Sequence, residues 1–135
     1  MTRYEEWIVR AKSAFELAQA KIIRYTCYED LCFQVQQSVE KALKGLLISY
    51  GIEPAFTHNI EVLIDELEKL IEVPQHIKKA TSLTKYAVFT RYPGEFDEIT
   101  KEEYEKSVKI AQECLDWAEN KINENKDKNF VILNV

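Results

Sequence analysis

The chain has 135 residues, of which 46% are hydrophobic and 30% charged, and its formal net charge is −5. This length and composition predict one globular domain with a sizeable buried core, and they exclude a disordered chain. The acidic balance argues against a broad surface for nucleic-acid backbones, which needs a basic excess, although a local basic patch is compatible with it. With three glycines and three prolines, the chain has few turn residues, so a few long helices are favoured over an all-β fold.

The N-terminal sequence lacks the features of a signal peptide, and no apolar run approaches the roughly 20 residues of a membrane span. We therefore expect a soluble cytoplasmic protein. Cys27, Cys32 and Cys114 match no zinc or disulfide spacing, and we expect them to be reduced, buried and inert. Neither His58 nor His76 lies three or four residues from another histidine or a cysteine, so no metal or other cofactor is expected.

Apolar residues recur every three or four positions in the first half of the chain, which predicts three amphipathic helices. The first is expected over about Tyr4–Tyr25. The second is expected over Asp30–Tyr50, with Asp30 as its N-cap and Gly51 as its C-terminal stop. The third begins at either Thr57 or Asn59 and has a stripe of isoleucine and leucine.

Two further helices are predicted in the second half. Pro74 suits the first turn of a fourth helix, which should end before Tyr92 because a residue that precedes proline is pushed out of the α region. Thr100 and Glu103 form a capping box for the last helix, whose apolar seam steps by four and three residues as far as Ile122.

The chain is expected to divide into a bundle and a tail. We expect residues 1–124 to form an all-α, up-and-down bundle of about five helices. Residues 125–135 are first polar and then apolar. As an extended strand this tail would fold back on the bundle, cross to a partner, or fray.

A polar ridge on the second helix is the first candidate site. Gln37, Glu40, Lys41 and Lys44 lie opposite the apolar face of that helix. Two ammonium groups and an amide on one ridge suit a phosphate or a base edge, whereas the alternative is a solvated face with weak ion pairs. Gln36 falls at the edge of the apolar face and is expected to bond a neighbouring backbone group or a second subunit.

Two loop positions are the other candidates. His58 precedes the third helix, where it either donates to a phosphate or serves as a structural hydrogen-bonding group; His76 is expected at the surface. In the run 90–94, Arg91 suits bidentate phosphate contact and Tyr92 offers a stacking surface. The alternative for Arg91 is that it caps the last carbonyls of the fourth helix.

The run Phe33–Leu47 resembles the signature second helix of HEPN domains (higher eukaryotes and prokaryotes nucleotide-binding). His58 before an isoleucine-rich helix, the Arg-Tyr-Pro turn at 91–93 and a final alanine-containing helix follow in that family's order, so that the resemblance covers about Tyr4–Ile122. It implies a helical bundle similar to the substrate-binding subunits of nucleotidyltransferases. It also implies a homodimer with a cleft between its subunits.

The resemblance implies three styles of function. Some members are metal-independent ribonuclease toxins with an arginine followed shortly by a histidine, some pair with a minimal nucleotidyltransferase in two-gene modules, and some bind nucleotides or RNA without catalysis. No histidine follows Arg91 in this chain. Asp97 and Glu98 are poor substitutes for a group that exchanges a proton near neutral pH.

We therefore expect a non-catalytic nucleotide- or RNA-binding HEPN module, acting as a homodimer with a minimal nucleotidyltransferase in a toxin–antitoxin-like system. The alternatives are a metal-independent ribonuclease toxin with a divergent active site and a plain dimeric interaction bundle. We assign phosphate contacts to Arg91, Lys41 and Lys44. Stacking is assigned to Tyr92, and polar readout to His58 or Gln37.

Overall fold

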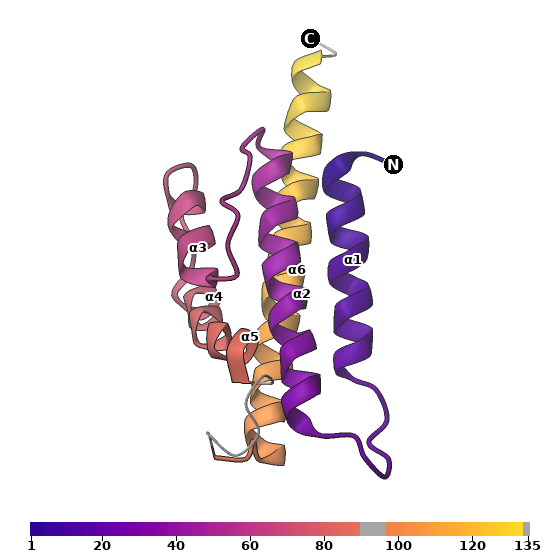
Figure 1. The fold of residues 1–135 in the computed structure, drawn as a ribbon. Helices are drawn as coiled ribbons and strands as arrows, with labels where there is room; N and C mark the ends of the chain where they lie inside the picture. The colour runs from indigo at the N-terminus through magenta and orange to yellow at the C-terminus, as the bar shows by residue number, and fades with distance from the viewer. Residues whose placement is uncertain (90–96, 134–135) are drawn as a thin grey trace.

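The computed structural model describes residues 1–89 and 97–133, and within these residues all regular secondary structure is helical (Figure 1). The predicted all-α class is confirmed. The elements are α1 (Arg3–Ala18), α2 (Tyr28–Ser49), α3 (Ile60–Glu68), α4 (Gln75–Lys78), the 3-10 helix η1 (Lys79–Lys85), α5 (Tyr86–Phe89) and α6 (Lys101–Leu133). No helix in this part of the chain has the length and apolar character needed to cross a membrane.

Helix α2 is the centre of the bundle. Figure 1 shows α1 running opposite to α2 and α6, and all three pack against one another, while α3, η1 and α5 contact α2 separately. Leu43, Leu46 and Leu47 of α2 are fully buried in the core. The apolar face predicted for the second helix is therefore the face that organises the fold.

A glycine sets how closely α1 approaches α2. A Cβ atom added at Gly45 would lie 3.2 Å from Trp7 Cβ and 3.2 Å from Ile8 Cδ1. The absence of a side chain at this position lets the two helices pack tightly. The indole of Trp7 is thereby held beside the polar positions of α2.

Helix α1 is shorter than predicted. It ends at Ala18 rather than near Tyr25, which lies outside the helix and is 81% exposed. One tertiary and one local hydrogen bond account for this: the Tyr104 hydroxyl donates to the Ala18 carbonyl at 2.6 Å, and the side-chain amide of Gln19 donates to the Phe15 carbonyl at 3.2 Å. Carbonyls of the last turn are satisfied in this way, so that the helix can stop there.

The starts of α2 and α3 refine two predicted caps. The N-cap of α2 is Cys27, so Asp30 lies inside the first turn and the prediction that it caps the helix is wrong. For α3, the side chain of Asn59 accepts the Glu61 amide at 3.0 Å, which makes Asn59 the cap rather than Thr57.

The fourth predicted helix is divided into α4, η1 and α5. Ser82 Oγ donates to the Lys79 carbonyl at 2.8 Å, and Thr84 Oγ1 accepts the Ile60 amide at 3.1 Å. The Ser82 hydroxyl bonds within its own turn and so competes with the α-helical ladder, which favours the 3-10 segment, whereas the Thr84 contact ties η1 to the start of α3. The predicted end of this helix before Tyr92 lies outside the described residues.

Helix α6 begins as predicted, because Thr100 Oγ1 accepts the Glu103 amide at 3.1 Å. It does not end near Ile122 but continues to residue 133, so the tail expected as an extended strand is helical up to that point. The polar run 123–129 contains no glycine or proline. In addition, Asn125 donates to the Ser49 carbonyl at 3.0 Å and ties this part of α6 to the end of α2.

The three cysteines are free, and two are buried as predicted. Burial raises the pKa of the Cys32 thiol to about 11 and that of Cys114 to about 12, so both are inert at neutral pH. Cys27 is exposed, so the prediction of burial is wrong for that residue. A hydrogen bond from its thiol to Asp30 raises its pKa.

Candidate functional site

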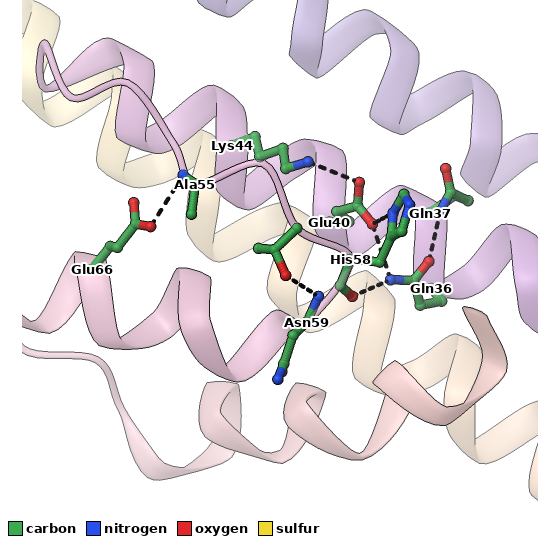
Figure 2. A network of polar contacts seen from close by, with 9 residues as sticks. Gln36, Gln37, Glu40, Lys44, Ala55, His58, Asn59 and Glu66 are labelled. Carbon is green, nitrogen blue, oxygen red and sulfur yellow. Dashed lines mark hydrogen bonds and ion pairs between the residues drawn. The ribbon is translucent and has the colours of Figure 1, made fainter. Parts of the chain in front are cut away.

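A buried carboxylate on α2 collects three donors (Figure 2). Glu40 is 4% exposed; its Oε1 accepts from Gln36 Nε2 at 3.2 Å and contacts His58 Nδ1 at 2.9 Å. Its Oε2 accepts from Lys44 Nζ at 3.1 Å. A buried carboxylate is tolerated only when it is hydrogen-bonded and paired in this way.

The same contacts fix the orientation of His58. An ionised carboxylate only accepts hydrogen bonds, so we infer that Nδ1 of His58 carries the proton that faces Glu40. The backbone carbonyl of His58 accepts from Gln36 Nε2 at 2.9 Å, which holds the loop from its other side. The His58 side chain is 66% exposed. Nε2 is therefore the ring nitrogen left for a ligand, as a hydrogen-bonding or proton-accepting atom.

Gln36 and Gln37 complete the network. Gln36 is fully buried, and its Oε1 accepts from Gln37 Nε2 at 2.7 Å. The prediction that Gln36 bonds a neighbouring backbone group is confirmed by its contact with the His58 carbonyl. An amide can donate and accept at once, which is why this residue type can link a helix, a loop and a second amide.

Comparison with known proteins assigns the family. The model of the HEPN domain matches residues 4–121, a range that contains the whole Glu40 network. The chain belongs to the HEPN domain family. The family resemblance read from the sequence is thereby confirmed.

Similar proteins support this assignment. The chain is 34% identical over 132 residues to "Putative toxin MJ1304" of Methanocaldococcus jannaschii, covering 90% of this chain and 84% of that protein. The crystal structure of TT1696 from Thermus thermophilus has a TM-score of 0.78 and 32% identity. ST0689, an archaeal HEPN homologue, has a TM-score of 0.68 and 34% identity. Each comparison covers 90% of this chain and 99% of the solved one.

In this HEPN chain the polar ridge of α2 is not a solvated face. Glu40 and Lys44 are buried, with Lys44 only 7% exposed, and Gln37 and Lys41 are half-buried. The ammonium group of Lys44 also lies over the Trp7 ring, 5.8 Å from its centroid. Lys44 is therefore a structural partner of Glu40 and Trp7.

Lys41 lies on a different surface. It lines a groove of about 400 Å³ between α1 and α2 together with Arg3, Glu6, Trp7 and Arg10. The residues of the predicted ridge thus lie in two different places. Gln37, Glu40 and Lys44 belong to the network that faces His58, whereas Lys41 lines this groove.

The remaining predicted residues have separate outcomes. Arg91 and Tyr92 lie outside the described residues, whereas His76 is exposed as predicted. Sequence reasoning missed Phe56, which is fully exposed two residues before His58. The available signal was an aromatic residue between Pro54 and His58, in a segment that belongs to no predicted helical stripe.

The Glu40–Lys44 pair generates a prediction about stability. Replacing Glu40 by Leu should lower the free energy of unfolding by about 3 kcal/mol or more, because Lys44 would be buried without its counter-charge. Lys44→Met should cost less, since Glu40 keeps Gln36 and His58 as donors. The double variant should recover much of the loss of the Glu40→Leu variant. Urea denaturation of the four proteins measures this; a double variant no more stable than Glu40→Leu would contradict it.

Proposed function

We propose that this HEPN chain is a nucleotide- or RNA-binding module without catalytic activity. It works in the cytoplasm as a homodimer, together with a minimal nucleotidyltransferase, in a toxin–antitoxin-like two-gene system. Membership of the HEPN family and the similarity to the Methanocaldococcus protein named "Putative toxin MJ1304" support the assignment to a toxin–antitoxin-like system. The network around Glu40 supports the binding activity.

The orientation of His58 is the observation that carries the proposal. A side chain that is two-thirds exposed normally samples several rotamers, and ordering it on ligand binding costs free energy. Here the contact with Glu40 and the bond from Gln36 to the backbone carbonyl order the imidazole in advance. Its Nε2 is thus a preorganised atom for polar contact with a base edge or a phosphate.

The loop that carries His58 also carries an exposed aromatic side chain. Phe56 is fully exposed and precedes His58 by two residues in the same loop. Stacking of a base on an aromatic ring contributes about 1–3 kcal/mol and tolerates any base. A loop with both an exposed phenylalanine and a fixed imidazole therefore suits a nucleobase better than it suits a free inorganic anion.

The other proposed contacts follow from residue chemistry. Arg91 is assigned to a phosphate and Tyr92 to a second stacking surface, as their side chains suit these roles. Gln37 is assigned to polar readout beside His58, and Lys41 to a phosphate bound in the separate groove between α1 and α2. Lys44 is assigned to holding Glu40, because it is buried and already paired.

The proposed dimer is supported by an exposed apolar segment at the end of α1. Leu17, Ile22, Ile23 and Tyr25 are between 48% and 81% exposed and follow one another closely in the chain. A cluster of exposed apolar side chains is typical of a surface that a second subunit covers.

A ribonuclease is the second candidate, and the Glu40–His58 contact is the observation that favours it. A carboxylate on Nδ1 and a free Nε2 form the arrangement of a general base. Nε2 would take the proton of a ribose 2′-hydroxyl, and the 2′-oxygen would attack the adjacent phosphorus. The bond from phosphorus to the 5′-oxygen would break, and that oxygen would need a proton from a second group.

Calorimetric titration with ATP and with a short single-stranded RNA tests the binding proposal. Wild-type protein should bind at least one of them, and His58→Ala should bind about tenfold more weakly because an oriented polar contact is lost. His76→Ala, which removes an exposed histidine on α4, is the matched control and should bind as wild type does. No binding by wild type, or unchanged binding by both His58→Ala and Arg91→Ala, would reject the proposed site.

Expression in growing bacteria tests the ribonuclease candidate. Wild type should arrest growth, and purified protein should cleave RNA in the presence of a metal chelator. His58→Ala should abolish both effects, since the proton-accepting nitrogen is gone, whereas His76→Ala should retain them. Harmless expression of the wild type, with intact RNA in the cleavage assay, would eliminate this candidate.

Light scattering tests the dimer. Wild type at micromolar concentration should have the mass of two chains, and Ile22→Asp with Ile23→Asp should shift it to one chain by placing charges in the apolar contact. Glu16→Gln, at an exposed position on α1, is the control and should remain dimeric. A monomeric wild type would refute the proposal.

A further inference from the structure

The groove between α1 and α2 has a mixed basic and aromatic lining. Arg3, Trp7 and Arg10 are spaced by four and three residues, so they share one face of α1. Lys41 lines the groove from α2, one turn before the close approach at Gly45. The volume of about 400 Å³ is within the range of small-molecule sites in proteins.

Two cations in this groove have no ion-pair partner within the part of the chain that the structure describes. Arg3 donates to both carboxylate oxygens of Glu53, at 2.6 and 2.7 Å, so its charge is already neutralised, and the same contact lowers the pKa of Glu53. Arg10 and Lys41, by contrast, form no ion pair with any residue in 1–89 or 97–128. They form a locally basic pair in a chain with a net charge of −5.

Trp7 and Glu6 add contacts of a different kind. The Trp7 ring is half-buried, and the Lys44 ammonium lies over it at 5.8 Å from its centroid. This ion contact and the packing at Gly45 hold the indole in place while part of it lines the groove. Glu6 is exposed on the same wall, where its carboxylate can accept hydrogen bonds from hydroxyl groups.

We propose that this groove binds a phosphorylated nucleotide. Arg10 and Lys41 contact its phosphate, Trp7 stacks on its base, and Glu6 accepts from its ribose hydroxyls. A terminal phosphate carries more negative charge than a phosphodiester and so makes better use of two cations. The inference rests on the proposed function for the class of ligand, but it places the contacts on α1, away from His58. The same chemistry is offered by a free nucleotide and by the phosphorylated end of an RNA strand.

Tryptophan fluorescence gives a direct readout of the groove. In a Trp117→Phe variant, Trp7 is the sole tryptophan. Titration with AMP, or with an RNA that has a 5′-phosphate, should quench its emission, because the base stacks on the indole. Inorganic phosphate should bind more weakly and quench little. Quenching by AMP at the same concentrations as by the RNA identifies a free nucleotide as the ligand, and quenching by the phosphorylated RNA alone identifies an RNA end.

Substitutions of the cations complete the test. Arg10→Ala and Lys41→Ala should each lower the affinity for the probe that quenches Trp7 emission. The expected loss is about tenfold, since each substitution removes a charge-assisted contact. Lys12→Ala is the matched control on α1, because Lys12 pairs with Glu119 outside the groove, and it should bind as wild type does.

Two results overturn the inference in distinguishable ways. In the first, the ligand binds without changing Trp7 emission, Arg10→Ala and Lys41→Ala bind it as wild type does, and His58→Ala does not bind it. This result rejects the groove and keeps the proposed function. Failure of wild type to bind AMP, ATP or RNA rejects both.

Discussion

The carboxylate of Glu40 is the group on which both the fold and the site depend. An ionised carboxyl group away from water is strongly unfavourable unless donors surround it. Here the donors come from two elements: Gln36 and Lys44 from α2 itself, and His58 from the loop that follows it. Satisfying one buried charge therefore fixes that loop against α2. The exposed imidazole edge is a consequence of this requirement, so a stability constraint and the proposed binding surface are built from the same atoms.

A second contact links this network to the groove between α1 and α2. The Lys44 ammonium bonds Glu40 and at the same time lies over the ring of Trp7. A continuous series of contacts thus runs from Trp7 through Lys44 and Glu40 to His58. Because Gly45 keeps α1 close to α2, a shift of the indole is transmitted to a packed neighbour rather than absorbed by empty space. Both proposed binding surfaces therefore adjoin the same buried ion pair.

The sequence predicts those features that depend on local periodicity. The apolar face of α2, the capping residue Thr100 and the all-α class follow from spacing and capping chemistry, and the structure confirms them. Features set by distant residues could not be read in this way. The end of α1 depends on a hydroxyl from Tyr104, 86 residues from Ala18. Likewise, periodicity places Lys44 opposite the apolar face, but it does not reveal that α1 covers that side.

The surroundings of His58 favour binding over cleavage. Transesterification of RNA needs a base for the 2′-hydroxyl and an acid for the departing 5′-oxygen, and one imidazole supplies only the first. Glu40 is buried and already hydrogen-bonded by its neighbours at both oxygens, so it is poorly placed to serve as that acid. Lys44 is buried behind it, and the other histidine of the chain, His76, lies on α4 rather than in this network. An arginine at position 91 would stabilise phosphate charge but cannot act as an acid, because its guanidinium does not lose its proton in proteins. The described geometry thus supplies a fixed polar group in a loop with an exposed aromatic residue, which fits the proposed recognition of a nucleotide better than its cleavage.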